Sequence, residues 1–223
     1  MPARVGHPIE EAKLTRSFDS SVGRLVRPGA GRSAYIVSEA EAPIGRPDVL
    51  VVVASPSVVD KYIADGVRVP NVSASKLLFD FGSLNGRTEH MTRVESSLRG
   101  DGWSRSRARR LALAVHDSLA IEAKVSDWRG GLRQVSRFRR SFQRSALLLP
   151  AGISIDPLHE PLLAYGCGLL LSDAGRVEWR FEGATVEPPL WARLWALELV
   201  ARSIESGSGY RVVSRAKRSI ASR

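Results

Sequence analysis

The segment Asp48–Ala54 reads DVLVVVA, an uninterrupted run of apolar and mostly β-branched residues after its first aspartate. A strand with one exposed face alternates apolar and polar residues, whereas a strand buried on both faces is apolar throughout. The run therefore predicts a central strand. Leu119–Val125 and Ser145–Pro150 have the same character, and a helix is predicted between them at Trp128–Arg144. This order predicts an α/β fold in which helices flank a central mixed sheet.

The other predicted elements divide the chain into three parts. Further strands are expected at Ser33–Ala42, Cys167–Ser172 and Arg176–Phe181, and further helices at Pro8–Phe18, Pro157–Tyr165 and Pro189–Ile204. Between the first two central strands, glycines and prolines separate four short helical stretches at Ser57–Ala64, Ser73–Phe81, Thr88–Arg99 and Ser104–Val115. We predict a discontinuous core (1–54 and 119–187), a helical insertion (55–118) with a helix-turn-helix as one arrangement, and a C-terminal apolar helix with a basic tail (188–223) that is loose from Gly207 onward.

Composition narrows the chemistry. The 223 residues carry a net charge of +10, and 28 of the 33 basic residues are arginine, which favours a polyanionic partner such as DNA. A single cysteine excludes an intrachain disulfide, a cysteine-rich zinc site and a four-cysteine cluster. The four histidines lack metal-binding spacing, so a metal would be held by oxygen atoms, which favours Mg²⁺ or Mn²⁺. Without a long apolar run we expect no membrane span, a cytoplasmic location, and association with the nucleoid when DNA is bound.

Two acids and a lysine occupy the predicted central strands. Asp48 opens one strand, and Glu122 and Lys124, two residues apart in another, project from the same face. Burying these groups among apolar residues costs free energy that a divalent cation would offset. Asp48, Glu122 and the backbone carbonyl of Ala123 could bind the metal, and Lys124 could stabilise a nucleophile or a developing phosphate charge. The alternative is a structural Glu122–Lys124 ion pair in an α/β regulatory or structural protein.

These residues resemble the PD-(D/E)XK nuclease superfamily. The resemblance rests on Gly45-Arg46-Pro47-Asp48, on Glu122-Ala123-Lys124, and on Gln134 to Phe138, which is close to the QxxxY element of some members. It implies a restriction-endonuclease-like core of helix, three strands, helix and strand, and Mg²⁺-dependent hydrolysis of DNA phosphodiester bonds. It also implies Asp48, Glu122, Lys124 and Gln134 as catalytic residues, with a further acid from the first helix, where Glu11 is preferred over Glu10; Glu39 and Glu41 are rivals from the first strand. Phe138 stands where the pattern has tyrosine, and the insertion lengthens the gap between Asp48 and Glu122. A catalytically silent nucleic-acid-binding protein with the same fold is the alternative.

Arginines form two candidate contacts to nucleic acid. On a helical wheel the arginines of the predicted Trp128–Arg144 helix lie almost opposite its apolar stripe: Arg129, Arg133, Arg137, Arg140 and Arg144. A second cluster in the insertion comprises Arg105, Arg107, Arg109 and Arg110, beside Trp103, which could stack on an unpaired base or close a small core. The C-terminal helix either covers the sheet or forms a homodimer interface.

Overall fold

A single mixed sheet organises the molecule. The computed structural model describes residues 15, 21–40, 45–80 and 88–212. Its strands, in chain order, are β1 (Ser33–Ser38), β2 (Val49–Ala54), β3 (Val115–Ala123), β4 (Arg144–Pro150), β5 (Gly168–Asp173), β6 (Arg176–Phe181) and β7 (Gly209–Val212). They lie in the order β6-β5-β4-β3-β2-β1-β7. The β3–β4 and β4–β5 pairs are parallel and the other pairs are antiparallel, so the predicted α/β class with a mixed sheet is confirmed.

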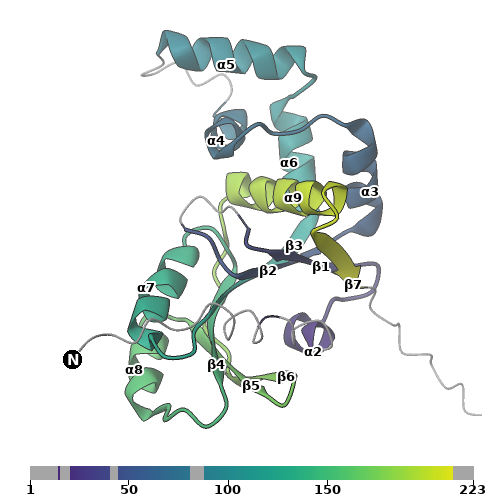
Figure 1. The fold of residues 1–223 in the computed structure, drawn as a ribbon. Helices are drawn as coiled ribbons and strands as arrows, with labels where there is room; N and C mark the ends of the chain where they lie inside the picture. The colour runs from purple at the N-terminus through teal and green to yellow at the C-terminus, as the bar shows by residue number, and fades with distance from the viewer. Residues whose placement is uncertain (1–14, 16–20, 41–44, 81–87, 213–223) are drawn as a thin grey trace, which may run out of the picture.

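Helices cover both faces of the sheet (Figure 1). They are α2 (Val22–Val26), α3 (Pro56–Asp65), α4 (Val72–Phe79), α5 (Glu89–Gly100), α6 (Arg105–Leu113), α7 (Trp128–Phe138), α8 (Asp156–Ala164) and α9 (Leu190–Glu205). Alternate residues of β2 point to opposite faces. Leu50 and Val52 belong to the core that includes α3, α6, α7 and α9, whereas Val49 and Val51 pack with α2. The β2 run is therefore apolar throughout because both of its faces are covered.

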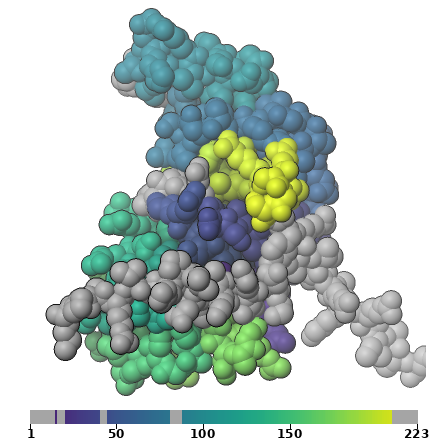
Figure 2. Space-filling model, viewed as in Figure 1, coloured from purple at the N-terminus to yellow at the C-terminus, as the bar shows by residue number. Residues whose placement is uncertain are grey.

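The predicted insertion is part of the main core. Its helices α3, α4 and α6 pack on α9, and α9 in turn packs on β1, β2 and β3 (Figure 1). The buried carboxylate of Glu198 in α9 accepts hydrogen bonds from the Tyr62 hydroxyl and, at 3.1 Å, from the Val69 N–H. Figure 2 shows the insertion in direct contact with the C-terminal segment. The predicted boundary after residue 118 falls inside β3, which begins at Val115. Helices α5 and α6 follow each other with four residues between them, and a helix-turn-helix arrangement stays a prediction.

For the C-terminal part, one of two alternatives is confirmed and one prediction is corrected. Residues 194–201 of α9 are all buried within the chain, so this helix covers the sheet and does not offer an apolar face for a homodimer. The segment after Gly207 is predicted to be loose, but up to Val212 it forms β7, which pairs with β1, Gly209 opposite Val37 and Val212 opposite Ala34. Residues 213–223, which hold the rest of the predicted basic tail, lie outside the described residues. The predicted helix at Pro8–Phe18 lies outside the described residues, apart from Thr15.

Candidate active site

The sheet brings three of the four predicted catalytic residues, Asp48, Glu122 and Lys124, together at one end. Val49 pairs with Ile121 in the antiparallel β2–β3 register, so Asp48 and Glu122, the next residue on each side, meet at the start of β2 and the end of β3. Lys124 follows β3 directly, and its backbone N–H donates to the Leu148 carbonyl at 3.0 Å. By strand alternation, Asp48 and Glu122 face the side of the sheet that α7 covers.

Backbone and side-chain contacts fix the two acids. The Oδ2 atom of Asp48 accepts a hydrogen bond from the Ala123 N–H at 2.7 Å, across the two strands. Glu122 is only 2% exposed, and its Oε1 lies 2.8 Å from the Nζ of Lys124. The Lys124 side chain is 16% exposed, so its ammonium is placed between the interior and solvent. The arrangement thus holds one fixed carboxylate and one buried ion pair side by side.

Electrostatics at Asp48 are set mainly by burial. Desolvation raises the pKa of the Asp48 carboxyl, and the nearby charge of Glu39 acts in the same direction. The Ala123 N–H and the Lys124 ammonium oppose this rise because both favour the carboxylate form.

Glu39 follows β1 and is exposed, and its N–H donates to the Asp48 carbonyl at 3.0 Å. Of the rival acids, Glu39 is thus near the site, whereas Glu10, Glu11 and Glu41 lie outside the described residues.

The donor set of this site can be tested against a metal. Within residues 15, 21–40, 45–80 and 88–212, no group of three or more His, Cys, Asp or Glu side chains could hold an ion. Mg²⁺ commonly uses only one or two carboxylates and takes its other ligands from water and substrate phosphate. Asp48, Glu122 and the Ala123 carbonyl fit that smaller set, in which the buried hard oxygens are the chemistry Mg²⁺ prefers.

Helix α7 closes over the site through an unusually close contact. A Cβ atom added to Gly131 would lie 2.8 Å from Cγ of Lys124 and 2.6 Å from Cδ1 of Leu147, so only glycine allows this approach. Gln134 is half-buried on α7, one turn after Gly131, and its part at the rim of the site stays a prediction. The consecutive glycines 130 and 131, each unfavourable inside a helix, are the sequence signal that could have revealed this contact.

The packing around residue 138 explains why phenylalanine stands at this position in place of tyrosine. It is 1% exposed and makes an edge-to-face contact with Phe142, with the ring centroids 6.5 Å apart. A Cβ atom on Gly45, whose φ is +91°, would come 3.1 Å from the Phe138 ring. The loop that leads to Asp48 therefore packs directly on this ring. A phenolic hydroxyl at position 138 would be buried and would need a partner, which phenylalanine does not.

The predicted arginine stripe is partly wrong. Helix α7 ends at Phe138, and Arg144 is instead the first residue of β4. Arg144 is 9% exposed, forms ion pairs with Asp117 and with Glu182, the latter at 3.5 Å, and stacks over Trp179. The wheel failed because the chain turns after Phe138 and enters the sheet, where Arg144 is held by acids. The exposed members are Arg129, Arg133, Arg137 and Arg140.

The second arginine cluster is also divided. Arg107 stacks over the Trp103 ring at 5.1 Å and pairs with Asp65 at 3.5 Å. Trp103 is only 3% exposed and packs edge-on against Tyr62, so it closes the core of the insertion and offers no surface on which a base could stack. The remaining three arginines of the cluster, Arg105, Arg109 and Arg110, are exposed.

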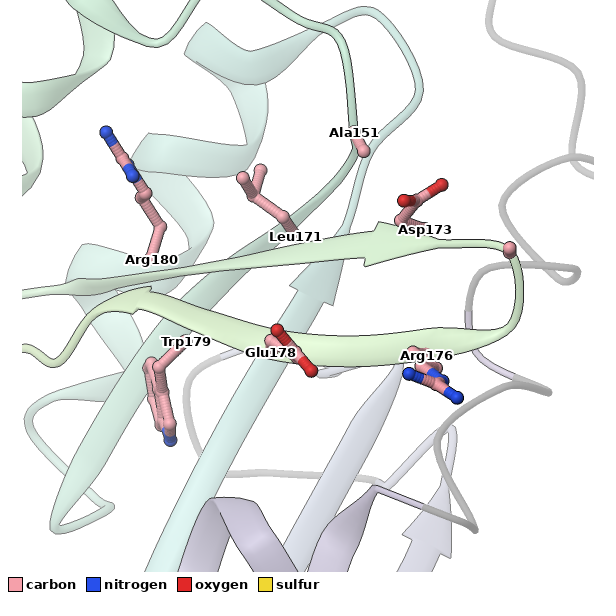
Figure 3. A pocket seen from close by; sticks show the side chains of 8 residues that line it. Ala151, Leu171, Asp173, Arg176, Glu178, Trp179 and Arg180 are labelled. Carbon is pink, nitrogen blue, oxygen red and sulfur yellow. The ribbon is translucent and has the colours of Figure 1, made fainter.

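A cavity at the β5–β6 hairpin lies outside the candidate site, and the polar side chains of this hairpin do not point toward one common centre. Its volume is about 600 Å³ (Figure 3). Asp173 and Arg180 extend on one side of the hairpin, whereas Trp179 points to the other side. The indole N–H of Trp179 donates to the Leu25 carbonyl at 3.2 Å, so this ring serves to anchor α2.

Comparisons with known proteins give a structural likeness alone. No family model matches the chain, and no curated protein matches it. A solved structure of a protein of unknown function from Silicibacter pomeroyi is similar, with 14% identity and a TM-score of 0.44. The match covers 88% of this chain and 87% of that one. No helix among the described residues is long and apolar enough to cross a membrane.

Proposed function

We propose that this chain is a Mg²⁺-dependent nuclease that hydrolyses DNA phosphodiester bonds. The observation that carries the proposal is the meeting of Asp48 with the Glu122–Lys124 pair on one face and at one end of the sheet. The fold supports it, since β1, β2, β3, α7 and β4 occur in the order of strands and helix implied by the PD-(D/E)XK resemblance once the inserted helices α3 to α6 between β2 and β3 are set aside. Mg²⁺ could equally be replaced by Mn²⁺, which takes similar oxygen ligands.

Each residue has a distinct part in the proposed reaction. Asp48 and Glu122, with the Ala123 carbonyl, would hold the ion, which supplies Lewis-acid activation of a water and of the phosphate. Asp48 is kept in position by the Ala123 N–H, so little rearrangement is needed to present its second oxygen. Lys124 places a compact positive charge beside Glu122, where it can stabilise the attacking oxygen and the charge that builds on the phosphate. Gln134 would orient a phosphate oxygen or a water from α7.

The cation requirement is tested most directly with DNA itself. Supercoiled, linear and single-stranded DNA should be cleaved with Mg²⁺ or Mn²⁺ and should stay intact with EDTA. Asp48→Asn should reduce cleavage by about a hundredfold or more, since the neutral amide is a poor ligand for a hard cation. Because the pKa of Asp48 is raised, wild-type cleavage should increase with pH over a range above that of an ordinary aspartate. Equal cleavage with EDTA and with Mg²⁺ would contradict the proposal.

A silent nucleic-acid-binding protein is the second candidate, and one observation favours it. The 2.8 Å contact between the Lys124 ammonium and Oε1 of Glu122 gives the buried acid a counter-charge without any metal. On this reading the three residues stabilise the sheet end and the exposed arginines alone carry the function. Such a protein would bind DNA with equal affinity in Mg²⁺ and in EDTA at matched ionic strength, and would not cleave it.

The exposed part of the α7 stripe should contribute to DNA binding in either case. Replacing Arg133, Arg137 and Arg140 with glutamine should weaken binding to all sequences. It should also lower the slope of log affinity against log salt by about one unit per lost phosphate contact. Fluorescence anisotropy over a range of salt concentrations measures both quantities.

A charge-matched control separates contact from general attraction. Arg24, Arg176 and Arg180 are exposed and lie on α2 and β6, away from α7. Their replacement with glutamine also removes three positive charges and should leave the slope of log affinity against log salt nearly unchanged. Equal slopes for the two triple variants would show that the α7 arginines form a solvated basic face and do not contact DNA phosphates.

A further inference from the structure

His116 occupies an irregular position at the other end of the β2–β3 pair. Val53 pairs with Asp117 and Ala54 pairs with Val115, so His116 is the extra residue of a β-bulge. Bulges re-aim a side chain that a regular ladder would hold within the sheet, and they are common beside binding sites. The ring is fixed by Ser55, whose Oγ lies 3.0 Å from Nε2. The bulge and this hydrogen bond together give the half-buried ring one defined orientation.

A cavity of about 340 Å³ opens beside this ring. Its wall includes Arg27 and Arg32, from the segment between α2 and β1, together with the polar side chains of Gln143 and Thr185. Arg27 has a left-handed backbone conformation, with φ of 41°, at the C-terminal end of α2. Donors thus reach the cavity from four separate segments of the chain.

The charges around the cavity do not cancel. Its two acids, Asp117 and Glu182, are both paired with Arg144. Neither Arg27 nor Arg32 forms an ion pair with any of the described residues. The pKa of His116 is lowered by burial and then by the positive charges of Arg32 and Arg193. The lining therefore carries three arginines and two acids, a net charge of +1, and among the described residues Arg27 and Arg32 are the lining arginines outside ion pairs.

We propose that Arg27, Arg32 and His116, with Gln143 and Thr185, form a binding site for a phosphate group. Guanidinium groups pair with phosphate through two parallel hydrogen bonds, and the amide and hydroxyl can serve the remaining oxygens. Donors that approach from several segments suit a tetrahedral anion better than a planar carboxylate. The site lies beyond Ala54, at the end of β2 opposite to Asp48, about 20 Å away for a six-residue strand. It is independent of the proposed nuclease activity.

The site is tested by the imidazole NMR signal of His116, assigned by its loss in His116→Gln. Titration with inorganic phosphate at constant ionic strength, with EDTA present, should shift this signal saturably. Short oligonucleotides with a 5′-phosphate or a 5′-hydroxyl then distinguish a free phosphate compound from a nucleic-acid end as the natural source. The double replacement Arg27→Gln and Arg32→Gln should weaken phosphate binding by at least about tenfold, as expected for lost charge-assisted hydrogen bonds.

The control carries the same change in charge elsewhere. Arg24→Gln with Arg180→Gln removes two exposed arginines outside the cavity and should leave the titration unchanged. Thermal melting of all variants verifies that the fold is kept. The proposal is overturned if phosphate leaves the His116 signal in place, if chloride shifts it equally, or if both double variants lose binding to the same extent.

Discussion

Replacing Lys124 with methionine should slow DNA cleavage by about a hundredfold or more, while DNA affinity changes little. The ammonium acts where negative charge is greatest, in the transition state, so its loss affects turnover more than binding. The same substitution leaves the 2% exposed Glu122 carboxylate without its cation and should lower the free energy of unfolding by about 3 kcal/mol. Single-turnover cleavage rates, anisotropy and chemical unfolding measure the three quantities.

The stability loss and the catalytic loss can be separated with two further variants. The double variant Glu122→Gln with Lys124→Met removes both charges, so it should recover much of the lost stability and still fail to cleave. Lys124→Arg keeps the positive charge and the stability, but its planar guanidinium replaces a compact ammonium poorly and should leave cleavage low. If Lys124→Met cleaves at the wild-type rate once corrected for its folded fraction, the pair is structural and the proposed site is wrong.

The central strands were predictable because strands buried on both faces consist of consecutive apolar residues. DVLVVVA and SALLLP predict buried strands from composition alone, and the structure places them as β2 and β4. The same pattern located Glu122 and Lys124, since polar residues two apart within an apolar strand must share a face. What joins Asp48 to Glu122 is register, which the intervening sequence does not encode locally. Asp48 and Glu122 were joined by the cost of burying two acids in apolar strands, and the resemblance agreed with that pairing.

Non-local packing explains most of the errors. The predicted helix extends to Arg144 because nothing in the local sequence marks the turn after Phe138. The residue that holds Arg144 in place is Asp117, which lies 27 residues earlier in the chain. Strand β7 is four residues long and exists through its pairing with β1. Covering the sheet was one of two alternatives for α9, and its contact with α3, α4 and α6 could not be foreseen from its own apolar residues.

His116 shows the limit for sites without a motif. In the sequence it is one of four scattered histidines without metal-binding spacing, and its neighbours in the chain do not indicate a site. The proposed site depends on a bulge between β2 and β3, which aims His116, and on Arg27 and Arg32, which lie nearly 90 residues earlier in the chain. Strand alternation predicts regular ladders only, so an extra residue that re-aims a side chain has no signature in apolar periodicity.

Gly131→Ala should destabilise the protein by about 1–3 kcal/mol and reduce cleavage, although alanine is the better helix former. The added Cβ would lie 2.6 Å from Leu147 and 2.8 Å from Lys124, so α7 must move away from β4 or Lys124 must leave its position beside Glu122. Either movement displaces the proposed catalytic ammonium. Gly23→Ala in α2 is the matched control, since nothing lies within 4 Å of its added Cβ, and it should be neutral or stabilising by up to about 1 kcal/mol. Urea unfolding and cleavage rates of both variants test the contact; a Gly131→Ala protein as stable and active as Gly23→Ala would show that α7 does not hold Lys124 in place.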